Sequence, residues 1–185
     1  MFDENTVFQF YAKSNDKPLA GKGAGEKIPA GRVKEFANLS KIPMWRRKLA
    51  NSWTDHPFTL DGMKWASVEH YYQASKFKGS NMDFYKTFSL DSNTELSRDV
   101  ALATAMGSKT GKYKGKVVRP STIKVDASFA SHKNATMYKA LEAKFTQHGD
   151  LKELLLETKD AKLTHFVLGA PSVTYYQLMR LRGTF

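Results

Sequence analysis

The sequence contains no cysteine among its 185 residues. Disulfide bonds, thiolate metal ligands and a cysteine nucleophile are therefore excluded, and we expect an intracellular, cytoplasmic protein (or a nuclear one in a eukaryote). Long apolar runs are also absent, since no stretch approaches the roughly 20 residues that cross a bilayer. The acidic start MFDENTVFQF lacks the order of a signal peptide. We therefore expect no membrane partner.

Acidic residues are scarce: 18 Asp and Glu stand against 29 Lys and Arg, which gives a net charge of +11. Such an excess concentrates polyanions or phosphorylated ligands near a protein, although a merely soluble basic surface is the alternative. No acidic residue occurs between Asp99 and Asp126. We expect the cations inside this stretch to hold phosphates: Lys109, Lys112, Lys114, Lys116 and Arg119.

Metal and covalent acyl chemistry find no support in the sequence. No two of the five histidines have the spacing of a metal site, and no G-x-S-x-G elbow is present. We therefore expect neither a metal nor a cofactor. The loop GKGAGEK fits neither standard phosphate-binding form. We interpret it as a flexible glycine loop, with backbone contact to a ligand as the open alternative.

The apolar patterning predicts one mainly α-helical α+β domain over residues 1–185, with a small antiparallel sheet. The hydrophobic content of 41% fits a folded chain. Asp61-Gly62 is a favoured hairpin turn, Ser67 can cap a helix and Gly79 can end it. Strands are expected at 8–11, 57–65 (a hairpin), 117–118 and 163–167, and helices at 43–51, 68–78, 83–88, 94–106, 133–147, 150–158 and 172–182.

The stretch VEHYYQASKF, residues 68–77, places a polar line on a mostly apolar helix. Glu69, Gln73 and Lys76 share one face, because positions i, i+4 and i+7 point the same way. A pocket walled by Tyr72 and Phe77 would explain this pattern, and burial would tune the pKa of the carboxyl or the amine for acid–base or imine chemistry. A solvated helix edge is the alternative.

The order of several segments resembles the NADAR family, which is linked to NAD and ADP-ribose and includes YbiA-type N-glycosidases. The most specific piece is W-x-[ST]-x-E-H-Y-[FY]-Q-A-x-K-F, matched from Trp65 to Phe77. The resemblance runs from Phe10 to Arg182 and includes EFANLSKI, ALEAKFTQH, LKELLLETKDAKLTHF and YYQLMRLR. It implies a compact, mainly helical α+β fold and an enzyme that hydrolyses N-glycosidic bonds.

The resemblance also implies roles for individual residues. Glu69 is the expected acid–base residue, and Lys76 is the expected amine that meets the sugar C1. The residues expected to bind the substrate are Trp65, Tyr72 and Gln73 beside them, and Phe10, Tyr11 and Asn38 in the matching N-terminal segments.

Two substrate classes are associated with the family: ADP-ribose on the amino group of guanine in nucleic acid, installed by DarT-type toxins, and phosphoribosylated pyrimidines of riboflavin synthesis. The positive charge favours the first, which implies ADP-ribosylated nucleic acid as substrate, ADP-ribose as product and functional pairing with a DarT-type ADP-ribosyltransferase. The segments KGKVVRPSTIKVD and HFVLGAPSVTYY lack the tryptophan and the W-G-x-G of YbiA-type members, which weakens the second. A non-catalytic module that binds ADP-ribose or nucleic acid is the third hypothesis.

Overall fold

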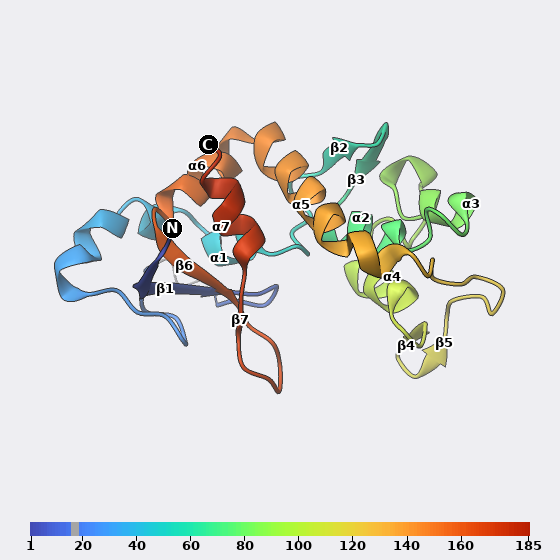
Figure 1. Ribbon diagram of the computed structural model, residues 1–185, viewed down its shortest axis with the longest axis horizontal. Helices are drawn as coiled ribbons and strands as arrows, with labels where there is room; N and C mark the ends of the chain where they lie inside the picture. The colour runs from blue at the N-terminus through green and yellow to red at the C-terminus, as the bar shows by residue number, and fades with distance from the viewer. Residues whose placement is uncertain (16–18) are drawn as a thin grey trace. The chain divides into compact units, whose positions relative to one another are not determined.

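The computed structural model describes residues 1–15 and 19–185. Its internal contacts define two compact units, one formed by Met1–Ala50 with His148–Phe185 and the other by Asn51–Gln147 (Figure 1). The mixture of helices and short strands confirms the α+β class, while a single domain over 1–185 stays a prediction. No helix in the described ranges is both long and apolar enough to cross a membrane.

The first unit contains a three-stranded sheet in the order β1-β6-β7, formed by Asp3–Phe10, Ala161–His165 and Val173–Thr174. β1 pairs with β6 in parallel, and β6 pairs with β7 antiparallel. The expected antiparallel pairing is therefore present between β6 and β7, whereas β1 joins the sheet in parallel. Short turns impose antiparallel pairing, but most of the chain lies between β1 and β6, so no hairpin constrains their direction.

Helices and 3-10 turns complete the first unit: η1 Ala30–Phe36, η2 Leu39–Lys41, α1 Trp45–Leu49, α6 Gly149–Glu157 and α7 Tyr176–Arg182. The ring of Phe8 meets those of Phe36 and Trp45 edge-on, with centroids 5.1 and 5.4 Å away. These buried aromatic pairs anchor β1 to the helical layer.

Two predicted helices of the first unit are shorter than expected. α1 begins after Met44, whose φ of 54° is left-handed, so Pro43 does not occupy the first helical turn. α7 begins only at Tyr176, because Thr174 pairs with Thr164 in the sheet and the Tyr175 N–H donates to the Leu163 carbonyl. Pairing with β6 thus overrides the helical pattern of residues 172–175.

The second unit begins with the predicted hairpin, β2 Phe58–Leu60 and β3 Met63–Trp65. Asp61 and Gly62 have φ values of 52° and 74°, as a two-residue hairpin turn with two left-handed positions requires. Helix α2, Val68–Ser75, follows and packs on α4, Val100–Gly107, and on the long helix α5, Phe129–Gln147.

The remaining elements of the second unit are α3 Met82–Lys86, η3 Leu90–Ser92, α4 Val100–Gly107, and the hairpin strands β4 Lys112–Tyr113 and β5 Lys116–Val117. The predicted helix at 94–106 is wrong in its first half. The Thr94 hydroxyl accepts from the Ser97 N–H in a turn, and the Asp99 carboxylate caps Leu102. Short polar side chains that bond to nearby backbone favour turns and caps over helix interiors.

Candidate active site

Helix α2 carries the predicted polar line and starts where the sequence indicates. The Ser67 side chain accepts from the His70 N–H at 3.2 Å, which satisfies one of the unpaired donors of the first turn. The helix ends at Ser75, earlier than the expected stop at Gly79, and Lys76 is its C-cap. Glu69, Gln73 and Lys76 therefore project from one face of a two-turn helix, the face that meets α4.

A hydrogen bond from Gln73, one helical turn later, fixes the Glu69 side chain. Gln73 Nε2 donates to Glu69 Oε1 at 2.7 Å. The Thr104 hydroxyl on α4 lies 3.1 Å from the same oxygen and 2.9 Å from the Val100 carbonyl, so its single proton serves one of the two. Oε2 of the half-buried Glu69 has no hydrogen-bond partner within the described ranges. One oxygen is thus fixed, and the other is available to a reacting group.

Lys76 contacts a carbonyl instead of a carboxylate. Its Nζ donates to the Gly107 carbonyl at the end of α4, at 2.8 Å. Burial lowers the pKa of Lys76 below its usual value; Glu69 partly opposes this shift, and the nearby Arg119 cation adds to it. No ion pair joins Glu69 to Lys76 in the described part of the chain. A half-buried amine with a depressed pKa has the property that imine chemistry needs.

Aromatic rings lie on two sides of α2. The half-buried Tyr72 ring lies 5.5 Å from Lys76 Nζ and edge-on to Phe129, and its pKa is raised by burial and then by Glu69. Trp65 is fully buried; its ring packs on Tyr71 and its indole N–H donates to the Leu60 carbonyl. Since Tyr71 points away from Glu69 along the helix wheel, Tyr72 borders the polar line and Trp65 supports α2 from behind.

Arg119 closes the loop that follows α4. Its guanidinium donates to the carbonyls of Met106, Ser108 and Lys109 at 2.8, 2.6 and 3.2 Å. Cations at a helix C-terminus satisfy carbonyls that lack an intrahelical partner. Arg119 was expected to hold phosphate, but these guanidinium hydrogen bonds go to backbone oxygens, and the guanidinium lies over the Phe77 ring, 5.9 Å from the centroid. It shapes the loop beside Lys76.

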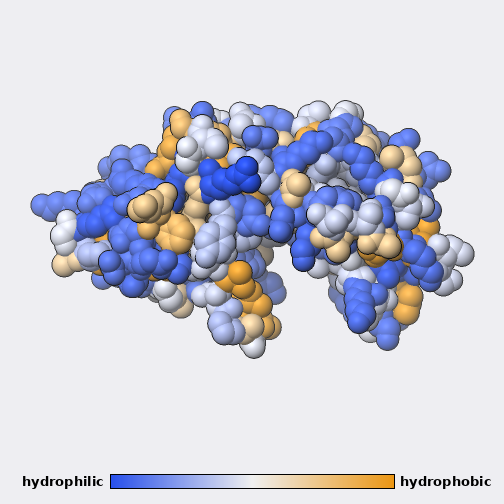
Figure 2. Space-filling view, in the orientation of Figure 1, coloured by the Kyte–Doolittle hydropathy of each residue, from blue (hydrophilic) through white to orange (hydrophobic). Residues whose placement is uncertain are grey.

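The four lysines of the basic stretch lie at the surface of the second unit. Lys109 precedes the β4–β5 hairpin, Lys112 and Lys116 lie on its strands, and Lys114 occupies its turn with a φ of 48°. All four are exposed, and none forms an ion pair with a described acidic residue. The surface over this hairpin, at the lower right of Figure 2, is mostly hydrophilic.

The three other predicted binding residues belong to the first unit and do not line one common pocket. Phe10 is fully buried against His165 and Tyr175. Tyr11 lines a pocket of about 240 Å³. Asn38 borders a different hollow and donates to Glu157 at 3.4 Å. Of these three, Tyr11 alone faces the 240 Å³ pocket.

Gly107 allows α4 to approach the polar line. A Cβ at this position would overlap the amide oxygen of Gln73 and lie 2.8 Å from its Cδ. We therefore expect Gly107→Ala to lower the free energy of unfolding by about 1–3 kcal/mol and to slow turnover, because Gln73 must move and release Glu69. Thermal melts and rates measure both effects.

Gly149→Ala is the matched control for Gly107→Ala. A Cβ at Gly149 meets no atom within 4 Å, and the residue opens helix α6. This variant should be neutral or slightly more stable. Equal melting temperatures and rates for the two variants would contradict the role of Gly107.

A family model and two curated relatives match this chain and agree with one another. The sequence model of the NADAR domain matches residues 32–167. The N-glycosidase YbiA of Escherichia coli (strain K12) is 33% identical over 160 residues, which are 86% of this chain and 69% of that protein. An N-glycosidase of Nostoc punctiforme is 29% identical over 114 residues, 61% of this chain and 62% of its own.

A solved structure agrees with these sequence matches. The NMR structure of E. coli YbiA covers 98% of this chain and 86% of its own, with 25% sequence identity and a TM-score of 0.54. The family expected from the motif at residues 65–77 is therefore confirmed.

Two contacts of the candidate site were not predictable from the motif. Thr104 and the Gly107 carbonyl meet Glu69 and Lys76 across the α2–α4 interface. Both lie more than 30 positions away in the sequence. Only the tertiary packing brings them to the polar line.

Proposed function

Because the chain belongs to the NADAR family, we propose that it is an N-glycosidase that removes ADP-ribose from modified guanine bases in nucleic acid. The observation that supports the chemistry is the arrangement on α2: Glu69 with one fixed and one available oxygen, and Lys76 with a lowered pKa on the same face. The N-glycosidase names of the relatives favour the same reaction class.

The proposed reaction breaks the bond between C1′ of ribose and the guanine amino nitrogen. Since no ion pair joins these two described side chains, Glu69 takes a proton from the Lys76 ammonium through one water molecule and delivers it to the guanine nitrogen as the bond breaks. The electron pair of that bond stays with guanine. The Lys76 nitrogen forms the new bond to C1′, where the oxocarbenium-like charge of glycoside cleavage develops.

Ring opening then gives an imine between Lys76 and C1′, with the ring oxygen leaving as the 4′-hydroxyl. Water adds to the imine carbon, the lysine leaves, and free ADP-ribose closes again. Glu69 receives and returns the protons of these steps. The apolar side of the site, formed by Tyr72 and Phe129, supports a neutral amine because it disfavours the ammonium.

The basic hairpin supports a polyanionic substrate. The lysines at 109, 112, 114 and 116 are exposed and follow directly on α4, whose end receives the Lys76 hydrogen bond. A net charge of +11 raises the local concentration of nucleic acid further. We assign these lysines to phosphates of the strand or of the ADP-ribosyl group.

One comparison tests the proposed substrate. A single preparation is given an oligonucleotide with ADP-ribosylated guanine and, separately, a phosphoribosylated aminopyrimidine. We expect release of ADP-ribose from the first and slow or no cleavage of the second. Cleavage of the pyrimidine alone would assign the chain to small-metabolite chemistry, and ADP-ribose binding without any cleavage would make it a binding module.

The salt dependence of binding tests the hairpin lysines. We expect the replacement of Lys112, Lys114 and Lys116 by alanine to flatten the plot of log affinity against log salt. The slope should fall by roughly 0.7–0.9 for each lysine that contacts a phosphate. Binding of a modified oligonucleotide to the Glu69→Gln variant, which should turn it over on the order of a hundredfold more slowly, gives the slope.

A matched variant removes the same charge elsewhere in the second unit. Lys64, Lys86 and Lys133 are exposed and lie outside the hairpin. Replacing these three by alanine should change the slope less. Equal slopes for the two triple variants would assign the hairpin lysines to solvent.

A further inference from the structure

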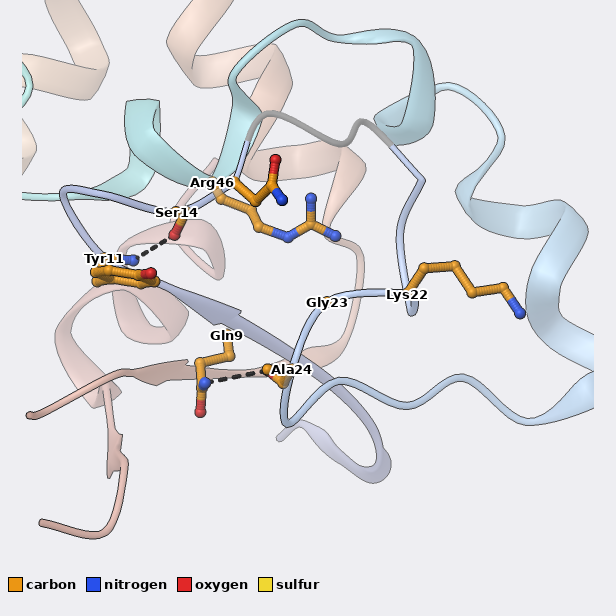
Figure 3. A pocket seen from close by; sticks show the side chains of 8 residues that line it. Gln9, Tyr11, Ser14, Lys22, Gly23, Ala24 and Arg46 are labelled. Atoms are coloured by element: carbon orange, nitrogen blue, oxygen red, sulfur yellow. Dashed lines mark hydrogen bonds between the residues drawn. The ribbon is translucent and has the colours of Figure 1, made fainter. Parts of the chain in front are cut away.

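The glycine loop of the first unit forms one wall of a built pocket. The pocket has a volume of about 240 Å³ and is bordered by Gln9, Tyr11, Ser14, Gly23, Ala24 and Arg46. In Figure 3, Arg46 lies on one side and Gln9 with Ala24 on the opposite side, while Tyr11 and the Gly23 backbone close the other two. Residues 21–25, expected to be a flexible loop, thus define a cavity.

A buried carboxylate holds this loop in place. The Glu26 side chain is fully buried and accepts from the Gly21 and Gly23 N–H groups, each at 3.0 Å, and from the Gln9 N–H at 3.3 Å. It also pairs with Arg46 through contacts of 2.7 and 2.8 Å. A Cβ at Gly23 would lie 2.8 Å from the Glu26 Cδ, so glycine is required there. The wall is preorganised.

The charges of the pocket argue against an anion as its occupant. The Arg46 guanidinium is neutralised by Glu26, and its Nη2 also donates to the Leu19 carbonyl. Lys22, the other cation at the rim, extends away from the space between Tyr11 and Gly23 in Figure 3. A buried ion pair contributes no net charge to a ligand, so the site favours a neutral group.

The remaining walls suit a flat polar ring. One side of Tyr11 packs against Phe166, with centroids 4.9 Å apart, which fixes the ring as a platform. The buried Ser14 hydroxyl accepts from the Tyr11 N–H, and within the described ranges its proton has no acceptor. Gln9 Nε2 donates to the Ala24 carbonyl, and the side-chain oxygen of Gln9 has no donor among the described residues. The Ser14 proton and the Gln9 oxygen, with the Asn15 amide beside them, therefore border an aromatic platform.

The volume limits the occupant to one ring system. Drug-sized ligands fill roughly 300–1,000 Å³, so a pocket of about 240 Å³ encloses the base of a nucleotide and leaves its sugar and phosphate outside. Stacking on an aromatic side chain and hydrogen bonds to ring edges are how proteins hold unpaired bases. We propose that this pocket binds a nucleobase of the substrate, a proposal that rests on the proposed function. The base comes from the ADP-ribosyl group or from the nucleic-acid strand.

Binding of AMP to the full chain tests the pocket without any need for catalysis. We expect AMP to bind and to shift the backbone amide signals of Gln9, Ser14 and Ala24 in NMR spectra, whereas ribose 5-phosphate leaves them unchanged. Tyr11→Leu should weaken AMP binding by about 5-fold to 150-fold, the range for loss of one stacked base. Tyr11→Phe should bind AMP like the unchanged chain.

Tyr176→Leu is the matched control, because Tyr176 is exposed and borders no part of this pocket. Displacement of AMP by ADP-ribose alone would identify the base as the adenine, and displacement by an unmodified single-stranded oligonucleotide alone would identify it as a base of the strand. Unmoved amide signals with AMP, equal shifts with ribose 5-phosphate, or equal affinities for Tyr11→Leu and Tyr176→Leu would overturn the proposal.

The two proposals fail separately. Cleavage of ADP-ribosylated guanine with no AMP signal at the pocket would leave the function and remove the nucleobase site. AMP binding that depends on Tyr11, without cleavage of any substrate, would leave the site and remove the function.

Discussion

Replacing Lys76 with alanine is expected to abolish turnover and, at the same time, the adduct that borohydride traps. Reduction makes an imine permanent, so the active chain should become covalently joined to ADP-ribose when borohydride is added during turnover. The amine must lose its proton first, and burial of Lys76 with Arg119 nearby favours this loss. Mass spectrometry of the reduced chain should locate the added mass on Lys76.

The pH dependence of the rate follows from the same pKa. The proton that reaches guanine comes from Lys76 by way of Glu69, so single-turnover rates should fall as the pH rises through the pKa of Lys76 and this proton is lost to solvent. Because the folded-state pKa lies below the ordinary value of 10.5, the fall should begin at a lower pH than a solvated lysine would give. The titration curve of a free lysine analogue provides the reference.

Lys86→Ala is the control for Lys76→Ala, because Lys86 is exposed in the same unit and lies on α3. It should leave both trapping and turnover unchanged. Near-normal turnover in Lys76→Ala, or an active chain from which reduction traps nothing, would rule out the imine. Direct activation of water by Glu69 would then be the mechanism to test.

Glu69→Gln is expected to slow turnover on the order of a hundredfold or more, while ADP-ribose still binds. The amide keeps the shape of the side chain, and its oxygen can still accept from Gln73 Nε2, which lies 2.7 Å from the present carboxylate oxygen. What disappears is the capacity to move a proton to the leaving guanine nitrogen. Single-turnover rates and calorimetric ADP-ribose titrations separate the two effects.

Glu95→Gln removes the same charge from an exposed position of the same unit and is the matched control. Its rate should match that of the unchanged chain. If Glu69→Gln cleaves within a fewfold of Glu95→Gln, Glu69 does not transfer the proton. If ADP-ribose binding is lost together with turnover, Glu69 holds the substrate instead of acting on it.

Much of the local structure could be predicted from short-range patterns. The Asp61-Gly62 turn, the Ser67 cap and the common face of Glu69, Gln73 and Lys76 depend on neighbours within a few positions. Backbone sterics and the 3.6-residue helical period determine these features whatever packs against them. The exclusion of disulfide bonds and of thiolate chemistry also follows from the sequence alone, because it contains no cysteine.

Element boundaries were less predictable, because contacts from distant segments decided them. Residues 172–175 have a helical pattern, yet pairing of Thr174 with Thr164 draws part of them into the sheet. The parallel direction of β1 and β6 likewise depends on strands that most of the chain separates. A periodicity shows which way a side chain points, but it does not show which segment lies opposite.

The sequence by itself determined the family, the α+β class and the three polar residues that share one face of α2. Only the tertiary structure decided what those residues contact. Gly107 lets α4 approach Gln73, and the Gly107 carbonyl accepts a hydrogen bond from Lys76 Nζ. Burial between these elements lowers the pKa of Lys76. It also showed that hydrogen bonds from the Gly21 and Gly23 N–H groups to Glu26 fix the glycine loop as one wall of a pocket. The physical reason is that local geometry sets directions, while desolvation and hydrogen-bond partners come from segments far away in the chain.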